Sequence, residues 1–349
     1  MNKKKTIAFF LSVLVSIGLL AFLFSQINTR DLTQTFQNIY VPALFGFMLF
    51  SLLGSGLRAW RYKWLLQPQP ISWKNIFLVT FIRNLFVDLF PVRIGALSYI
   101  YILNKRFKYS FEISTSSFII AFLFDFLTLS PILIIAVLFV GIGTTVISGP
   151  LMILISVLVF LGFFLILWKL VSLSDLILRT YTFLLKKTKL RNKKWAHISI
   201  TKIRSTLQCL QEIQKKNIYW PVFILSFFIR LAKYASLFLL LFSLLRYHGV
   251  LFNTFNFFKT VLGITGAEMS SALPIKGIGG FGTWESAWVL ASKLMNFENK
   301  LAIISGIGIH LISNLFEYFL GIVSLLVIYS PFYQAKKNSN SERNSPDQS

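Results

Sequence analysis

Two short stretches of the chain place a proline, a cation and a glycine in the same order. They are FPVRIG at residues 90–95 and LPIKGIG at residues 273–279. Proline interrupts a helix and glycine permits a turn, so Arg93 and Lys276 are expected at breaks in the helical chain. A cation there can bind an anionic group through charge-assisted hydrogen bonds, and we predict this role for both. Chance is the alternative, because proline and glycine are common in membrane helices.

The second stretch continues into a glycine-rich segment that ends at Glu285. Glycine adopts positive φ angles and lets a ligand approach backbone N–H groups closely, so Gly279, Gly280 and Gly282 are candidate binding residues. Residues 277–282 also match the G-x-G-x-x-G pattern of dinucleotide-binding proteins. That pattern requires a preceding strand, whereas the flanks here are typical of membrane segments, so we reject the dinucleotide interpretation.

Ionisable side chains also occur inside the apolar segments, where each costs at least about 2.5 kcal/mol to insert. They are functional candidates: cations would hold an anionic headgroup, and acids would orient the cations or exchange protons. The alternatives are ion pairs that only fix helix packing, or extension of Arg230 and Lys233 to the membrane surface. His310 is expected to be packed and hydrogen-bonded. The predicted substrate-binding residues are Arg83, Arg93, Gly95, Asp125, Arg230, Lys276, Gly279, Gly280, Gly282, Glu285 and Glu317.

The composition indicates a membrane protein. Of the 349 residues, 55% are hydrophobic and 13% are charged, and the mean hydropathy is +0.69. A soluble domain of this length would carry far more charge, so we predict an all-α protein that crosses the membrane several times. The net charge of +23 comes from basic residues in loops. We therefore expect no nucleic-acid partner, and we expect the basic loops to contact anionic lipid.

Six apolar segments reach the length of about 20 residues that is needed to cross a membrane core of roughly 30 Å. They are residues 6–24, 39–57, 114–140, 150–168, 218–245 and 301–329. The first follows three lysines, as a secretory signal would, but its apolar run is too long and no small-residue cleavage site follows. We expect it to be a retained helix.

The distribution of basic residues predicts the orientation. Twelve lysines or arginines lie in residues 169–217 and none in 141–149, so the first loop is expected in the cytoplasm and the second outside. Basic residues also flank the first and last apolar segments, which places both termini in the cytoplasm. Arg58 and Arg61 follow the segment 39–57 and are expected in a cytoplasmic loop.

Both proline stretches lie in segments that must leave the membrane on the side they entered. Residues 75–103 and 257–294 are therefore each predicted to be a pair of short membrane segments or a re-entrant hairpin, giving eight or more membrane segments in total. One hairpin enters from the cytoplasmic side of the membrane and the other from the outside. The unit of one helix, one hairpin and one more helix therefore occurs twice, in opposite orientations. This arrangement is typical of inverted-repeat transporters, where irregular backbone lines a cavity because it cannot face lipid. The predicted organisation is one transmembrane domain, 1–334, with a basic cytoplasmic loop, 169–217, and a disordered tail, 335–349.

Other kinds of chemistry have little support in the sequence. Cys209 is the only cysteine, which excludes an intrachain disulfide. His197, His248 and His310 lie apart in the sequence, so no metal site is predicted. The sequence has no nucleophile elbow, Walker loop or metalloprotease motif. We expect neither a cofactor nor an enzymatic activity, with a membrane glycosyltransferase, or an accessory subunit of lipid or cell-envelope biosynthesis, as the alternative.

Several of these residues resemble a known family. The matching pieces are Arg58-Ala59-Trp60-Arg61, the turn with Pro91, Arg93 and Gly95, Asp125, and above all the run from Pro274 to Glu285. Together they are similar to the flippase-like transmembrane domain of the lysylphosphatidylglycerol synthase family, over about residues 6–330. The resemblance implies a multi-pass bacterial inner-membrane protein that moves an anionic phospholipid or a polyprenyl-linked lipid across the membrane.

The chain departs from the family pattern in the first hairpin and the helix after it. Family members usually carry a glutamate where this chain has Ala96, and a Glu-Arg pair where it has Ala121 and Phe122. These changes deplete the polar site of the first repeat. The soluble aminoacyl-transferring domain is also absent, so we expect that the chain does not make lysyl-lipid by itself.

Overall fold

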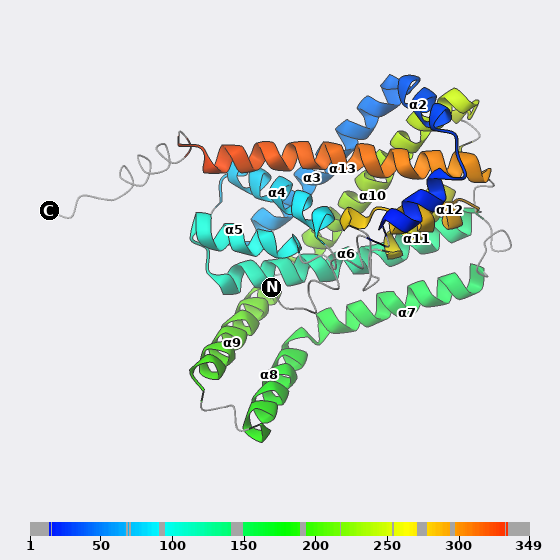
Figure 1. The fold of residues 1–349 in the computed structure, drawn as a ribbon. Helices are drawn as coiled ribbons and strands as arrows, with labels where there is room; N and C mark the ends of the chain where they lie inside the picture. The colour runs from blue at the N-terminus through cyan, green and yellow to red at the C-terminus, as the bar shows by residue number, and fades with distance from the viewer. Residues whose placement is uncertain are drawn as a thin grey trace.

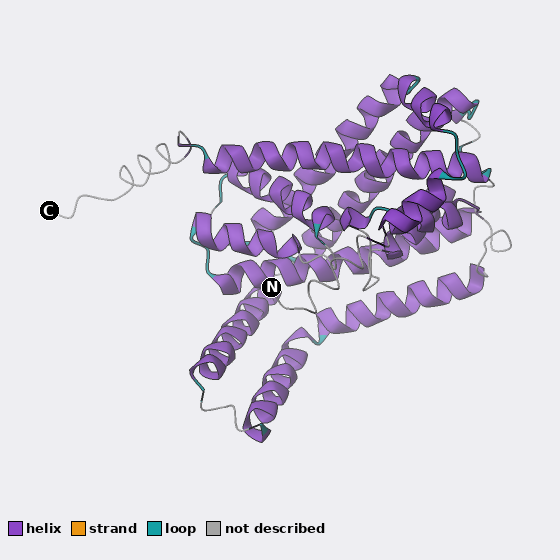
Figure 2. Ribbon diagram, in the orientation of Figure 1, coloured by secondary structure: helices purple, strands orange, loops and turns teal. Residues whose placement is uncertain are grey.

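In a computed structural model, the chain folds into a bundle of helices (Figure 1). The structure describes residues 14, 16–67, 69, 71–90, 95–140, 149–188, 193–216, 218–252, 255–270, 278–293, 297–331 and 333. These residues contain no strand, as Figure 2 shows. The all-α prediction is therefore confirmed for the described part of the chain.

The helices differ greatly in length. Residues 16–24 are helical. They are followed by α2 Thr29–Gln37, α3 Val41–Leu65, α4 Trp73–Leu89, α5 Leu97–Phe107, α6 Phe111–Val140, α7 Gly149–Trp168, α8 Leu170–Lys187, α9 Lys194–Lys215, α10 Tyr219–Leu245, α11 Phe257–Met269, α12 Thr283–Ser292 and α13 Asn299–Tyr329. Two short 3₁₀ helices are η2 Arg246–His248 and η5 Ile278–Gly280.

Five helices are long and apolar enough to cross a membrane: α3, α6, α7, α10 together with η2, and α13. They correspond to five of the six predicted membrane helices. Of the sixth prediction, residues 6–24, the structure describes residue 14 and residues 16–24, and these are helical. The chain is thus a multi-pass membrane protein.

The predicted end of the second apolar segment is wrong. Helix α3 continues to Leu65 instead of ending at residue 57, and Arg61 has no exposed surface. Arg58 and Arg61 therefore belong to a packed helix and not to a cytoplasmic loop. Burial of neighbouring Tyr62 and Leu65 in the core keeps this last part of the helix packed against the bundle.

Each predicted hairpin segment contains two short helices. Helices α4 and α5 have 17 and 11 residues, and α11 and α12 have 13 and 10. At about 1.5 Å per residue, α5, α11 and α12 are much shorter than the roughly 30 Å core of a membrane. The prolines and cations predicted at the turns, within residues 91–94 and 271–277, lie outside the described residues.

Helices α3 and α10 cross closely. Small residues allow it: a Cβ atom built on Gly54 would lie 3.5 Å from Ala232 Cβ, and one on Gly46 would lie 2.8 Å from Leu239. Residue numbers rise along α3 as they fall along α10, so the two helices are antiparallel. The hairpin helices pack on distant partners, because α4 contacts α13 and α11 contacts α6.

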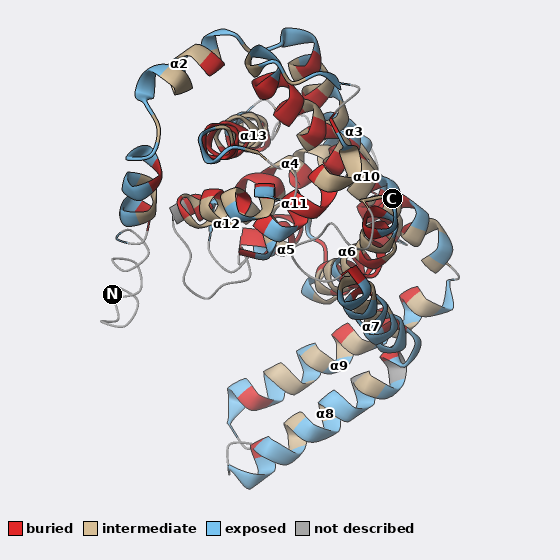
Figure 3. Cartoon of the chain, turned by 90° about the vertical axis from the view of Figure 1, so that its right-hand side faces the viewer, coloured by how far each residue is buried: buried red, intermediate tan, exposed pale blue. Residues whose placement is uncertain are grey.

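Helices α8 and α9 form an arm that projects from the bundle (Figure 1). Figure 3 shows that most buried residues lie in the bundle, whereas the arm is largely exposed. Both helices are amphipathic. The arm is tied to α6 by an ion pair of 2.5 Å between Lys202 and Glu112 and by a hydrogen bond of 2.9 Å from Ser116 to the Thr206 carbonyl.

Candidate functional site

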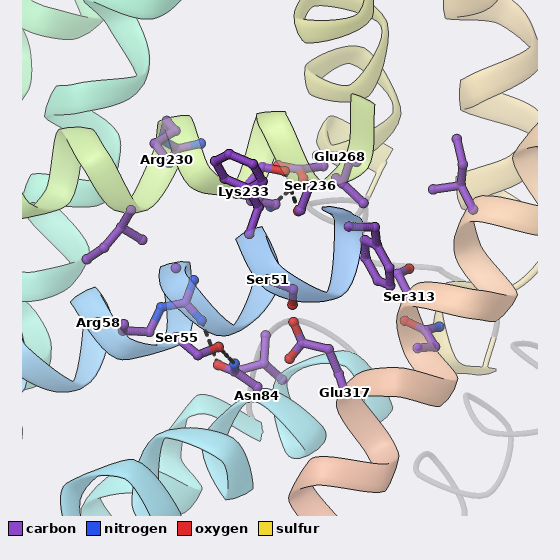
Figure 4. Close-up of a pocket in the computed structure, with 18 of the residues that line it drawn as sticks. Ser51, Ser55, Arg58, Asn84, Arg230, Lys233, Ser236, Glu268, Ser313 and Glu317 are labelled. Atoms are coloured by element: carbon purple, nitrogen blue, oxygen red, sulfur yellow. Dashed lines mark hydrogen bonds and ion pairs between the residues drawn. The ribbon is translucent and has the colours of Figure 1, made fainter. Parts of the chain in front are cut away.

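A polar cavity of about 280 Å³ lies inside the bundle, lined by α3, α4, α6, α10, α11, α12 and α13 (Figure 4). Both hairpins therefore contribute to its wall. Its charged lining residues are Arg58, Arg83, Asp125, Arg230, Lys233, Glu268 and Glu317. Charged groups within membrane-spanning helices are costly unless they have partners, so their meeting at one cavity marks this as the candidate site.

Two arginines converge on one neutral side chain at this cavity. Arg58 Nη1 donates to Asn84 Oδ1 at 2.6 Å, and Arg83 Nη1 approaches the same oxygen at 3.3 Å. Asn84 is buried and donates to Ser55 Oγ at 3.3 Å. Among the described residues, neither arginine forms an ion pair with a carboxylate. Each guanidinium has five N–H donors, so this pair can hold an anionic group in the cavity.

A second group of charges connects α3, α6 and α10. Arg61 donates to both carboxylate oxygens of Asp125, at 2.6 and 3.3 Å, and to Ser226 Oγ at 2.8 Å. Arg230 Nη2 donates to the backbone carbonyl of Asp125 at 2.6 Å. Asp125 is thus held by Arg61, and Asp125 also lines the cavity. Arg58 and Arg230 line the same cavity and add positive charge to it.

Two glutamates also line the cavity, Glu268 and Glu317. Lys233 on α10 forms an ion pair with Glu268 on α11, the first helix of the second hairpin. Glu317 points from α13 towards Ser51 of α3 in Figure 4. Both Arg230 and Lys233 line the cavity.

A buried carboxylate and a histidine close the wall near the second hairpin. Glu285 on α12 has no exposed surface, and its Oε1 lies 2.6 Å from Nδ1 of His310 on α13. The other carboxylate oxygen accepts a hydrogen bond of 2.7 Å from the Gly282 backbone N–H. His310 itself lines the cavity. The prediction of a packed and hydrogen-bonded His310 is confirmed.

The glycines of the second hairpin have the backbone conformation expected of them. Gly279, Gly280 and Gly282 all have positive φ angles, of 61°, 84° and 85°. In the first hairpin, the backbone of Phe86 lies very close to Gly95. A Cβ atom on Gly95 would lie 1.6 Å from the Phe86 carbonyl oxygen. Glycine is needed at all four positions for chain geometry, and their contact with a substrate stays a prediction.

The cavity brings together some of the predicted substrate-binding residues and leaves others apart. Four of them line it, namely Arg83, Asp125, Arg230 and Glu317. Glu285 lies behind His310 and reaches the cavity only through it. Arg93 and Lys276 lie outside the described residues.

Arg58 and Asn84 are among the residues of the site that sequence reasoning missed. A signal for Arg58 is present in the sequence. The aromatic and aliphatic residues do not stop at residue 57 but recur at Trp60, Tyr62 and Trp64, which indicates that the helix continues past the arginine. No comparable signal marks Asn84, because a single amide in a short apolar segment has many ordinary packing roles.

Within the described part of the chain, no group of three or more His, Cys, Asp or Glu side chains is placed to hold a metal ion. The chemistry available at the cavity is anion binding by arginine and proton exchange by histidine and carboxylates. The model of a protein family described as "Lysylphosphatidylglycerol synthase TM region" matches residues 9–321, which include both hairpins and all residues of the cavity wall. A search of curated proteins finds no match.

Proposed function

The chain belongs to the lysylphosphatidylglycerol synthase TM region family, and we propose that it is a lipid transporter that moves an anionic phospholipid or polyprenyl-linked lipid across a bacterial inner membrane. The family membership places the protein in a lipid-related process of the membrane. The cavity adds the chemistry, because arginines inside a membrane bundle can replace the water around an anionic headgroup. In this proposal the headgroup enters the cavity while the lipid tails stay in the bilayer.

We infer that the bundle is an inverted repeat. One unit is α3, the α4–α5 hairpin and α6, and the other is α10, the α11–α12 hairpin and α13. The antiparallel crossing of α3 and α10 supports this, as does the exchange of hairpin contacts, since α4 packs on α13 and α11 packs on α6. The short helices favour hairpins that re-enter on their own side. The basic arm and both termini would face the cytoplasm.

One observation carries the proposal: Arg58 and Arg83 share the neutral acceptor Asn84 at the wall of a cavity between the two units. If the cluster served only helix packing, a carboxylate in place of Asn84 would offset its charge more fully. An amide instead orients both guanidinium groups and leaves their positive charge for a ligand. A phosphate or phosphodiester matches two guanidinium groups because it offers several acceptor oxygens.

The test is lipid movement in vesicles that contain the full chain. Fluorescent phosphatidylglycerol is followed from the inner to the outer leaflet, with a neutral fluorescent lipid as the comparison. Arg58→Gln and Arg83→Gln are each expected to lower the rate about tenfold or more, because a hydrogen bond to a charged group contributes about 1.5–3 kcal/mol. Arg179→Gln, at an exposed position on the arm, is the matched control and should keep the rate.

Two results would count against the proposal. Rates equal to those of protein-free vesicles, for phosphatidylglycerol and for a polyprenyl phosphate, would contradict lipid transport. In the second result, the wild-type protein moves lipid, and Arg58→Gln and Arg83→Gln both keep the wild-type rate. That result would mean that the headgroup binds at a different site.

A further inference from the structure

The pair formed by Glu285 and His310 is not explained by anion binding. Glu285 is fully buried, and a buried carboxylate is costly unless hydrogen bonds stabilise it. Its two oxygens have two different partners: the Gly282 N–H at 2.7 Å and His310 Nδ1 at 2.6 Å. The first contact caps the start of α12. The second reaches across to α13 and is not needed for that cap.

The contact determines which nitrogen of His310 can exchange a proton. An ionised carboxylate only accepts hydrogen bonds, so the nitrogen beside Glu285 must carry a hydrogen. With Glu285 ionised, Nδ1 is the donor, and Nε2 is the nitrogen that can gain or lose a proton. Neutral His310 presents an acceptor at Nε2, and protonated His310 presents a donor with a positive charge.

The surroundings of the ring leave it open towards the cavity. The rings of Phe281 and Trp284 lie 4.5 and 5.1 Å from it, centroid to centroid, and supply no charge. Gly280 also has no side chain to cover Nε2, because a Cβ there would lie 3.6 Å from this nitrogen. About 9% of the His310 side chain is exposed, on the wall of the cavity that contains the arginines. His310 is therefore mostly buried, with Nε2 beside Gly280 and a small exposed part of the side chain on the cavity wall.

Charged groups of both signs surround this site. Those lining the same cavity are Arg58 on α3, Arg83 on α4, Asp125 on α6, Arg230 and Lys233 on α10, Glu268 on α11 and Glu317 on α13. From α12, Glu285 contacts the ring, and from α2, Asp31 pairs with Lys300 at the start of α13. A proton on His310 adds positive charge to a cavity whose described lining holds four cations and three acids. An anionic headgroup would offset that charge.

We infer that His310, held in place by Glu285, takes up and releases a proton at Nε2 and so couples lipid movement to proton movement across the membrane. This inference rests on the proposed transport function. The proton comes from water in the cavity on one side and returns to water on the other. Protonation favours the state with the anionic headgroup bound, and deprotonation favours its release. His310 is the proton-binding residue, and Glu285 is a positioning residue.

The first experiment observes the imidazole directly, without transport. The full chain is labelled with ¹⁵N-histidine and placed in lipid nanodiscs, and His310→Gln identifies the signal among the three histidines. We expect neutral His310 to carry its hydrogen on Nδ1 and the ring to gain a second proton, at Nε2, as the pH is lowered. A hydrogen on Nε2 of the neutral ring, or no protonation of the ring at any pH at which the protein stays folded, would overturn the inference.

Glu285→Gln makes this experiment sharper. The Gln oxygen can still accept from the Gly282 N–H, but its NH₂ group then faces Nδ1 and must donate. We expect His310 to change to the form with hydrogen on Nε2, while the α12 cap is retained. If folded Glu285→Gln keeps the hydrogen on Nδ1, Glu285 does not set the tautomer of His310 and is not its positioning residue.

The second experiment measures coupling in vesicles with and without a pH gradient. Wild-type protein should move phosphatidylglycerol several-fold faster when protons flow with the anionic lipid, and a pH-sensitive dye should report proton entry. His310→Gln and Glu285→Gln should lose the response to the gradient. His248→Gln is the matched control, because this histidine contacts Thr35 at 2.8 Å on another part of the chain and should keep the response.

The outcomes separate the two proposals. If the wild-type rate of lipid movement does not depend on the pH gradient, the coupling inference is wrong, but the proposed transport function is unaffected. A His310→Gln variant that keeps the full response would also overturn the coupling inference. Absence of any lipid movement would contradict the transport function instead, and the ¹⁵N titration would then decide the proton site without reference to transport.

Discussion

Arg61 and Asp125 join α3 to α6 by two hydrogen bonds of 2.6 and 3.3 Å, and the Arg61 side chain has no exposed surface. Removing one partner of a fully buried ion pair destabilises a protein by about 3–5 kcal/mol. Asp125 keeps a 29% exposed side chain at the cavity, so we expect Arg61→Met to lower the melting temperature in detergent by less than that full cost implies. The measurement is thermal unfolding followed by the amount of monodisperse protein.

The double variant Arg61→Met with Asp125→Leu separates charge from packing. Since both charges are then gone, it should be more stable than Arg61→Met alone. A double variant that is no more stable than the single variant would show that the contact does not act as an ion pair.

These residues also show where sequence reasoning stops. Asp125 was recognised because an acid in an apolar helix is rare, and the long helices followed from length and hydropathy. Its partner was missed, because Arg61 follows an apolar run and basic residues in such places usually lie in cytoplasmic loops. Only the fold shows that α3 continues and that residues 64 positions apart meet.

The hairpins illustrate the same division. Proline and glycine predicted two pairs of short helices, and pairs of short helices are present at α4–α5 and α11–α12. The pairing of Glu285 with His310 could not be predicted, because it depends on how α12 packs on α13. Hydropathy indicates which segments enter the membrane, but not which faces of their helices meet.

Asn84→Asp tests whether the arginine pair must keep its charge. The substitution preserves the shape of the side chain and still accepts from Arg58 and Arg83, so the fold should be retained. The added carboxylate offsets the positive charge, and the rate of phosphatidylglycerol movement should fall about tenfold, the effect of about 1.4 kcal/mol. Asn38→Asp adds the same charge at an exposed position at the end of α2 and should have no effect. Equal transport by Asn84→Asp and wild type would argue against an anion site at these arginines.

Gly282→Ala tests the backbone of the second hairpin. Gly282 has φ of 85° and ψ of −51°, which side-chain-bearing residues rarely adopt, and a Cβ would lie 2.9 Å from Leu19 Cβ. We expect a loss of about 1–3 kcal/mol in stability, measured by thermal unfolding. Gly162→Ala on α7 is the control, because nothing lies within 4 Å of its Cβ position. That substitution should be neutral or slightly stabilising, since alanine favours helix. A Gly282→Ala variant as stable as Gly162→Ala would mean that the positive φ is not required.

Cys209 on α9 reports the orientation and the packing of the arm. Burial, together with the nearby Glu212 and Glu112 carboxylates, raises the pKa of the Cys209 thiol above its ordinary value. A raised thiol pKa leaves less reactive thiolate at neutral pH, so labelling by a membrane-impermeant maleimide should be slow at pH 7. It should increase about tenfold per pH unit until the pKa is reached.

The same thiol distinguishes the two sides of the membrane. Because the proposed orientation places the arm in the cytoplasm, inverted membrane vesicles should be labelled and intact cells should not. Cys209→Ser combined with Lys215→Cys moves the thiol to an exposed position on the same helix and should be labelled from the same side, but faster at pH 7. Labelling of intact cells would reverse the orientation, and equal rates for the two thiols at pH 7 would contradict the raised pKa.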